Sequence, residues 1–226
     1  MENKLTRRTT LAGIMAAGFS ALVASPVWAG VLDGKSIKSL LGGASDGALD
    51  KLGKPGTFYA DTAVRILLPG TSGKLASKLL KAGDKLGVTS KLTKSLNDAA
   101  GLAALEAKPV FRKAVDGLSI ADVPGIVGKN DGATQYLKKS AGDDLQAKVR
   151  PLISSALTKV GAFDQLGKLG STGGLLGLAK LDNNSLTDSV TKQAMNGIFN
   201  YMGKEEAGLR GNLLGVGKGL LDKVLK

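Results

Sequence analysis

The sequence predicts an all-α protein, folded as a single multi-helix bundle of about seven to nine helices. Two observations carry this prediction. Apolar residues recur three, four or seven positions apart through most of the chain, and runs of Val, Ile and Tyr with the period of a β-strand are nearly absent. The 43% hydrophobic and 22% charged composition is that of an ordinary globular chain. We therefore expect a packed helical core.

Residues 1–29 have the pattern of a cleavable export signal. Arg7 and Arg8 lie in a positive start, an apolar run covers residues 11–24, and Ala29 ends a Val-Trp-Ala string that suits a signal peptidase. The apolar run is shorter than the roughly 18–20 residues that span a bilayer. We expect cleavage after Ala29 and no transmembrane span in the mature chain.

The two arginines leave the export route open. The string Thr-Arg-Arg-Thr-Thr-Leu at 6–11 resembles a twin-arginine motif, although Thr10 stands where that motif usually has Phe. An ordinary signal that starts with two arginines explains the same residues. Either route predicts a periplasmic protein.

Residues 30–226 are predicted to form one domain, with its elements in the following order. A helical arm is expected over residues 31–52, and turns are expected at Pro55-Gly56 and Pro69-Gly70. The apolar stripes that predict the later helices are Leu75, Leu79 and Leu86; Leu92, Leu96, Ala99 and Ala103; Val110, Phe111, Ala114, Val115 and Leu118; Leu145, Val149, Leu152, Ile153, Ala156, Leu157 and Val160; Val190, Ala194, Ile198, Tyr201 and Met202; and Leu209, Leu213, Val216, Leu220 and Val224.

Proline, glycine and short polar residues mark the breaks between these helices. Pro109 predicts a kink or a restart of the helix. Asp182 to Ser185 predict a loop, with Ser185 or Thr187 as the cap of the next helix. The glycine-rich segment 164–181 is expected to be a mobile loop, since each interior glycine weakens a helix.

Two absent residue types exclude much familiar chemistry. The chain has no Cys and no His, so disulfides, thiolate or imidazole metal sites and Ser-His-Asp catalysis are excluded. No acidic calcium loop and no phosphate loop occur. We expect no cofactor and no metal.

Several short strings lie in a fixed order across the mature chain. They are Ala-Val-Arg-Ile-Leu-Leu-Pro at 63–69, Glu-Ala-Lys-Pro-Val-Phe at 106–111, Asn-Asp-Gly-Ala-Thr-Gln-Tyr at 130–136, Arg-Pro at 150–151, Val-Thr-Lys-Gln-Ala-Met-Asn-Gly-Ile-Phe at 190–199, and Glu205-Glu206 with Arg210. The set resembles a bacterial family of exported proteins catalogued as domain of unknown function 4197. The resemblance implies an exported, mostly helical protein and no particular activity. The chain departs from it in the glycine-rich segment 164–181 and in the glycine-rich tail.

Eight polar residues of these strings form the candidate polar or ligand cluster. They are Arg65, Glu106, Asp131, Thr134, Tyr136, Glu205, Glu206 and Arg210.

Asp131 or Asn130 could cap the following helix, whose first N–H groups, with Lys129 nearby, could hold an anion. The alternative is a purely structural turn, in which Thr134 and Tyr136 tie two helices together. Glu206 and Arg210 are expected to form an ordinary exposed i,i+4 ion pair.

The remaining members are predicted to meet in the interior. Arg65 is expected to pair with a carboxylate such as Glu106 or Glu205, and Ile66-Leu67-Leu68 is expected to plug the core. Glu205 is expected to meet Arg65, Lys108 or Arg150.

A second candidate surface is a basic face on an amphipathic helix pair. Its members are Lys74, Lys78, Lys81, Lys85, Lys91 and Lys94. Such a face could meet anionic lipid or glycan, or it could simply keep the protein in solution. The whole chain carries 31 Lys and Arg against 19 Asp and Glu, a net charge of +12.

These observations favour an exported protein that binds rather than catalyses. The partner classes are an apolar small molecule held between helices, an envelope protein, and an anionic lipid or glycan surface. Nucleic acid is not favoured, because aromatic and basic residues do not alternate as they do where bases stack. The alternatives are a carboxylate-based enzyme built on Glu205, Glu206, Asp131 and Tyr136, and a structural factor of the cell envelope.

Overall fold

The computed structural model describes residues 33–69, 88–120, 126–171 and 181–224. Within these ranges the chain forms helices and no strand, so the predicted all-α fold is confirmed. The helices are α1 (Gly34–Leu52), α2 (Thr57–Ala60), α4 (Val88–Glu106), α5 (Lys108–Asp116), α7 (Gly132–Lys159), α8 (Ala162–Ser171) and α9 (Asn183–Val224).

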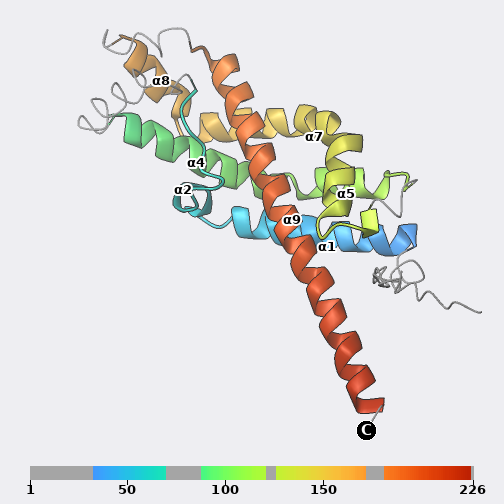
Figure 1. The fold of residues 1–226 in the computed structure, drawn as a ribbon. Helices are drawn as coiled ribbons and strands as arrows, with labels where there is room; N and C mark the ends of the chain where they lie inside the picture. The colour runs from blue at the N-terminus through green and yellow to red at the C-terminus, as the bar shows by residue number, and fades with distance from the viewer. Residues whose placement is uncertain (1–32, 70–87, 121–125, 172–180, 225–226) are drawn as a thin grey trace, which may run out of the picture.

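The long helix α9 crosses the bundle, while α1, α4 and α5 run across it (Figure 1). α9 packs mainly against α1 and α7, and α4 packs against α7. Because α9 runs from Asn183 to Val224 without a break, the last two apolar stripes predicted from the sequence belong to one continuous helix. Asp182 begins it, because its Oδ1 accepts the N–H of Ser185 at 2.7 Å.

Helix α1 is part of the core and not an arm. Ile37, Leu41, Leu49 and Leu52 have no exposed surface and pack within the central apolar cluster. Asp33 caps the helix by accepting the N–H of Ser36 at 2.8 Å. The expected helical arm is therefore wrong, because α1 lies between α9 and α5.

Proline shapes two of the helices, and at Pro109 it does so as predicted. The helical stretch restarts at Pro109, since α4 ends at Glu106 and α5 begins at Lys108. Pro151 lies inside α7, and Figure 1 shows α7 changing direction part-way along its length. A proline removes one hydrogen bond of the helix and produces such a bend.

The first part of the glycine-rich segment 164–181 is helical. α8 covers its first part to Ser171, and Leu166 of α8 is buried against the core. The expectation of a mobile loop is therefore wrong for residues 164–171. Residues 172–180 lie outside the described ranges.

The non-helical segment 61–69 begins with a turn at residues 62–64 and is held against the bundle by two side-chain amides. Asn97 of α4 accepts the N–H of Ile66 at 2.8 Å and donates to its carbonyl at 2.9 Å. Gln193 of α9 makes the same two bonds with Leu67, both at 2.9 Å. Ile66 and Leu68 are buried, whereas Leu67 is 53% exposed. Two of the three predicted plug residues therefore reach the core.

Candidate functional site

Glu206 and Arg210 on α9 carry the most deeply buried charges in the described ranges. The Glu206 side chain is fully buried and the Arg210 side chain is 8% exposed. Arg210 donates to Glu206 Oε1 from Nε at 2.9 Å and from Nη2 at 2.7 Å. The i,i+4 pair is present as predicted, but the prediction that it is exposed is wrong.

The carboxylate of Glu206 also binds the start of α7. It accepts the N–H groups of Ala133 at 3.0 Å and Thr134 at 2.7 Å, and Arg210 Nη2 donates to the Ile126 carbonyl at 3.3 Å. The first turn of a helix has unpaired N–H groups and a partial positive charge. Since a buried charge is tolerated when it is paired and hydrogen-bonded, this cluster forms a stable link between α7 and α9.

The helix start that the sequence offered to an anion is therefore occupied by the protein itself. Asp131 precedes α7, but its side chain makes no capping bond and instead accepts from Gln135 Nε2 at 2.8 Å. The expected cap by Asp131 is wrong. The expected anion site beside Lys129 is not formed, because Glu206 takes two of the N–H groups that it would use.

Arg65 does not pair with a described carboxylate. Its Nε donates to the carbonyl of Tyr59 at 2.6 Å, and its guanidinium lies 5.0 Å from the centre of the Tyr59 ring. The predicted pairing with Glu106 or Glu205 is wrong. The short helix α2 brings Tyr59 beside Arg65, so local contacts satisfy the guanidinium.

Glu106 and Glu205 each form a separate ion pair with a lysine. Lys159 Nζ lies 2.9 Å from Glu106 Oε1, and Lys51 Nζ lies 2.5 Å from Glu205 Oε1. The partner of Glu205 is therefore Lys51, and the predicted pairing with Arg65, Lys108 or Arg150 is wrong. The two carboxylates lie in different ion pairs and are not joined in one site.

Tyr201 of α9 forms a hydrogen bond with Asp61, at the start of the non-helical segment 61–69. Its Oη donates to Asp61 Oδ2 at 2.7 Å. This bond, with the partial burial of the ring, raises the pKa of Tyr201 to about 12. The same bond and the N–H of Ala63 lower the pKa of the Asp61 carboxyl. The pair keeps the phenol neutral and ties the segment to α9.

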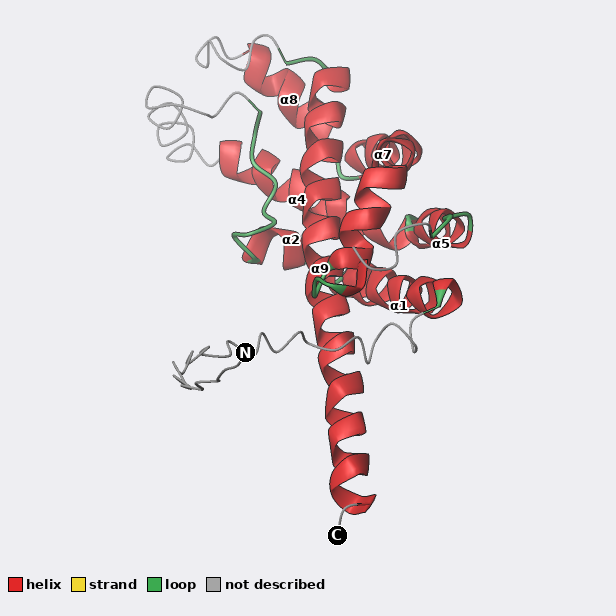
Figure 2. Cartoon of the chain, turned by 45° about the vertical axis from the view of Figure 1, so that its right-hand side comes forward, coloured by secondary structure: helices red, strands yellow, loops and turns green. Residues whose placement is uncertain are grey.

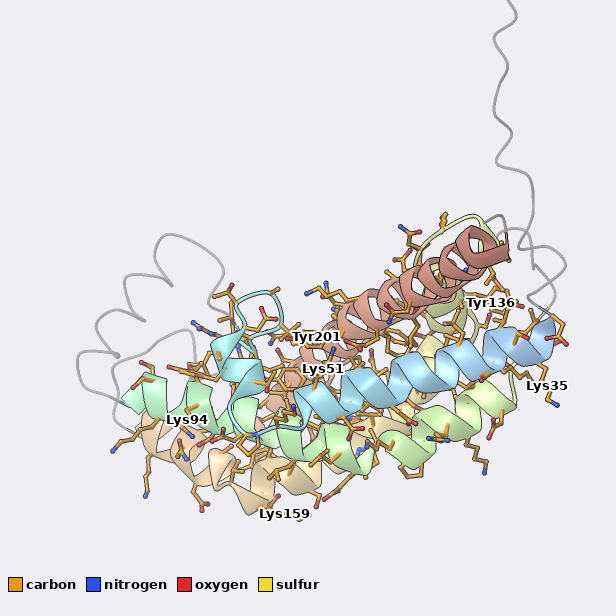
Figure 3. The ribbon with its side chains drawn as sticks, turned by 90° about the horizontal axis from the view of Figure 1, so that it is seen from below. Lys35, Lys51, Lys94, Tyr136, Lys159 and Tyr201 are labelled. Atoms are coloured by element: carbon orange, nitrogen blue, oxygen red, sulfur yellow. The ribbon has the colours of Figure 1, made fainter. Side chains whose placement is uncertain are left out.

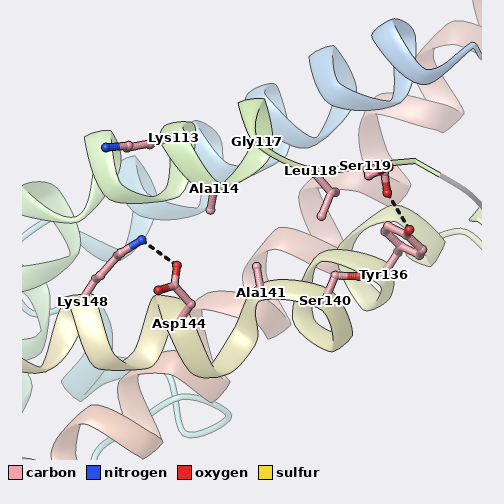
Figure 4. A pocket seen from close by; sticks show the side chains of 10 residues that line it. All are labelled: Lys113, Ala114, Gly117, Leu118, Ser119, Tyr136, Ser140, Ala141, Asp144 and Lys148. Carbon is pink, nitrogen blue, oxygen red and sulfur yellow. Dashed lines mark hydrogen bonds and ion pairs between the residues drawn. The ribbon is translucent and has the colours of Figure 1, made fainter.

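A hollow of about 530 Å³ lies between α5 and α7. Figure 4 shows its two ends. At one end Tyr136 Oη donates to the Ser119 carbonyl at 2.7 Å, and at the other end Lys148 pairs with Asp144 at 2.6 Å. Lys113 of α5 lines the same hollow. Tyr136 thus ties α7 to the residues that follow α5, as the structural alternative predicts.

A second hollow of about 540 Å³ shares Tyr136 and Ser140 with the first. Lys129 and Lys139 line it. We call the two hollows together the basic groove, defined by Lys113, Lys129, Lys139 and Lys148 around Tyr136 and Ser140.

The charges of the basic groove are unbalanced. Among the residues that the structure describes, Asp144 is the one carboxylate that lines it, and Lys148 pairs with that carboxylate. Lys113 and Lys139 are exposed and form no ion pair with any described carboxylate. Ammonium groups and the exposed Ser140 hydroxyl are donors, which suits phosphate or carboxylate oxygens.

Comparison with known proteins identifies the family. The family described as "Protein of unknown function (DUF4197)" matches residues 33–226. The chain belongs to the DUF4197 family. No curated protein and no solved structure matches it.

Over the ranges that the structure describes, no helix of this DUF4197 chain combines the length and the apolar character that a membrane span needs.

The predicted basic face of the DUF4197 chain is described only in part. Lys91 and Lys94 are exposed on α4, and Lys94 pairs with Asp98 at 2.7 Å. Figure 3 shows Lys94 and Lys35 at opposite ends of the molecule. The other four members, Lys74, Lys78, Lys81 and Lys85, lie outside the described residues.

Sequence reasoning missed most of the basic groove. It named Tyr136 but treated it as a structural residue, and it did not group Lys113 with Lys139. These lysines lie on different helices, so no periodic pattern in the sequence joins them. The one available signal is the pair Lys138-Lys139 beside Tyr136, which is short and common on helix surfaces.

Proposed function

We propose that this DUF4197 chain is an exported, periplasmic binding protein that recognises a phosphate-bearing group of the cell envelope in the basic groove. The features of residues 1–29 support export, as argued from their charge and apolar pattern. The observation that supports the binding proposal is the positive charge of Lys113 and Lys139 beside Tyr136 and Ser140, since neither lysine forms an ion pair with a described carboxylate.

The groove suits an anion better than an apolar molecule. Its lining combines four lysines with the hydroxyl-bearing residues Ser119, Tyr136 and Ser140, beside the apolar side chains of Ala114, Leu118, Ile126 and Ala141. Each basic residue contributes about 1 kcal/mol to binding near an anionic surface. A third hollow, between α1 and α5, is less suited, since Arg112 pairs there with Asp46.

The phosphate could be carried by a lipid headgroup or by a glycan, and the recognition chemistry is the same. Vesicles of mixed neutral and anionic phospholipid test the first source. A soluble phosphorylated oligosaccharide tests the second. Binding to either should weaken steeply with salt and be lost near about 0.5 M, where charge screening is short-ranged.

The test replaces Lys113 and Lys139 together by glutamine in the mature chain, residues 30–226. Loss of two contributions of about 1 kcal/mol each should lower the affinity for the phosphate probe about 30-fold. The matched control replaces Lys54 and Lys192, which are exposed and do not line the groove, by glutamine. It removes the same charge and should cost much less.

Two results would overturn the proposal. Equal losses in the two double variants would mean that net charge, not the groove, attracts the probe. Binding that ignores salt would mean that the lysines do not supply the affinity. Circular dichroism of each variant checks that the helical fold is retained.

A further inference from the structure

The basic groove contains an acidic side chain in the hollow between α5 and α7. These two helices lie side by side at one side of the bundle (Figure 2). Asp144 lines this hollow together with Lys113, Ser140 and Lys148. A negative charge in this place opposes the binding of a simple anion, and it favours a ligand that carries a positive charge as well.

The polar side chains that α7 contributes to this hollow lie one turn apart. Ser140, Asp144 and Lys148 are four residues apart in one helix, so they share a face, with about 6 Å of rise between neighbours. Figure 4 shows the Asp144 carboxylate and the Lys148 ammonium on the side of α7 that faces α5. The hollow therefore places an acceptor for a cation about one turn from donors for an anion.

The ion pair between Lys148 and Asp144 can open at little cost. The two side chains are 53% and 59% exposed, although Lys148 Nζ lies 2.6 Å from Asp144 Oδ2. Ion pairs as exposed as this one contribute little to stability, because water screens them. A ligand with both charges can replace the one pair by two, since its anion takes Lys148 and its cation takes Asp144. A ligand with an anion alone would leave the Asp144 carboxylate without a partner.

A phosphate ester with an ammonium group two carbons away fits this arrangement. Its phosphate oxygens can accept from Lys113, Lys148 and the Ser140 hydroxyl, while its ammonium donates to Asp144. A two-carbon linker is long enough to place the two charges at neighbouring turns of α7. The hollow, at about 530 Å³, is within the range of pockets that bind small molecules.

This inference rests on the proposed function and deepens it. We propose that the basic groove prefers a phosphoethanolamine group over a phosphate without an ammonium, and that Asp144 recognises the ammonium. Such a group can belong to a lipid headgroup or to a glycan, and its charges are the same in both.

The test compares two soluble phosphate diesters on residues 30–226. Glycerophosphoethanolamine carries the ammonium, and glycerophosphoethanol is the same diester without it. Asp144→Asn removes the carboxylate from the groove. Asp143→Asn is the matched control, because Asp143 is exposed at the neighbouring position of α7 and lines neither hollow of the groove. NMR titration measures the affinity of each protein for each diester.

Asp144→Asn should change the two affinities in opposite directions. We expect about a three- to fivefold loss for glycerophosphoethanolamine, the effect of one exposed charged contact. We expect a gain of similar size for glycerophosphoethanol, because Lys148 is released and a repulsion is removed. The ratio of the two affinities should therefore fall about tenfold. Asp143→Asn should leave this ratio unchanged.

Vesicles of phosphatidylcholine with added phosphatidylethanolamine distinguish the two sources of the group. Their quaternary choline groups cannot donate a hydrogen bond to Asp144, so only the added lipid presents the proposed ligand. Binding that rises with phosphatidylethanolamine and exceeds that of the soluble diester assigns the lipid headgroup. Binding of the soluble diester alone assigns a glycan-borne group. Either result agrees with the proposed preference.

The remaining outcomes separate this inference from the proposed function. Equal affinities of the unaltered protein for the two diesters, or parallel changes of both in Asp144→Asn, would overturn the inference alone. The proposed function would then still hold if Lys113→Gln with Lys139→Gln weakens both diesters. If that lysine variant binds both diesters as well as the unaltered protein does, the proposed function fails and the inference fails with it.

Discussion

At the scale of single residues, the decisive feature is a buried charge pair that is also a helix cap. Removing a carboxylate from water costs several kcal/mol, and an attractive partner with additional hydrogen bonds is needed to offset that cost. Glu206 has both, from Arg210 and from two N–H groups of α7. The Glu206 side chain therefore pairs with the charge of Arg210, binds the first N–H groups of α7 and links α9 to α7.

We expect Glu206→Gln to lower the free energy of unfolding by about 3–5 kcal/mol, because it leaves the charge of Arg210 buried without a partner. Urea unfolding of residues 30–226 measures this change. Glu205→Gln is the matched control, since its partner Lys51 is 54% exposed. That control should cost less than about 1 kcal/mol. Equal costs would contradict a special role for the buried pair.

At the scale of whole elements, the position of α7 depends on a close backbone approach at its first residue. A Cβ added to Gly132 would lie 2.1 Å from the carbonyl oxygen of Ile126, and that oxygen belongs to the backbone. Ile126 also accepts a bond from Arg210. Glycine at this position lets the turn before α7 fold tightly enough for Glu206 to reach the helix start.

Gly132→Ala should destabilise the fold by about 1–3 kcal/mol, the usual range for a forced shift in a packed region. Gly142→Ala, in the same helix, is the comparison. Its added Cβ would come no closer than 3.8 Å to Lys138 Cγ. That change should stabilise by about 0.5–1 kcal/mol, because alanine is the better helix former. Thermal and urea unfolding measure both, and a stable Gly132→Ala variant would refute the close approach.

At the scale of the whole molecule, the described core and the family match both begin after the predicted leader. Ile37 is the first residue of the described core, and the family match begins at residue 33. The features of residues 1–29 predict that the leader is removed on export.

We expect the exported protein to begin at Gly30, because Val27-Trp28-Ala29 ends in the small residue that a signal peptidase requires. Intact-mass measurement of protein from the periplasmic fraction checks this prediction. A product that retains residues 1–29 would contradict it. Replacing Arg7 and Arg8 by lysine then separates the two routes: export stops on the twin-arginine route and continues on the general one.

Features that depend on local geometry were predicted correctly, whereas side-chain partners that depend on the packing of distant helices were not. The stripes Leu92, Leu96, Ala99 and Ala103 and the restart at Pro109 were predicted correctly, because both depend on local geometry. The partners of Arg65, Glu205 and Asp131 were predicted wrongly. Their choice depends on which helices meet, and residues far apart in the chain leave no periodic signal.

The sequence by itself determined the helical class, the apolar faces and the membership in the DUF4197 family. These follow from periodicity, proline and composition, which act over a few residues along the chain. Only the tertiary structure decided that Glu206 lies at the start of α7, that the lysines of the basic groove gather around Tyr136, and that α9 extends beyond the bundle (Figure 2). Each of these arises from packing between distant segments, where burial and charge pairing select one arrangement among many that share the same helices.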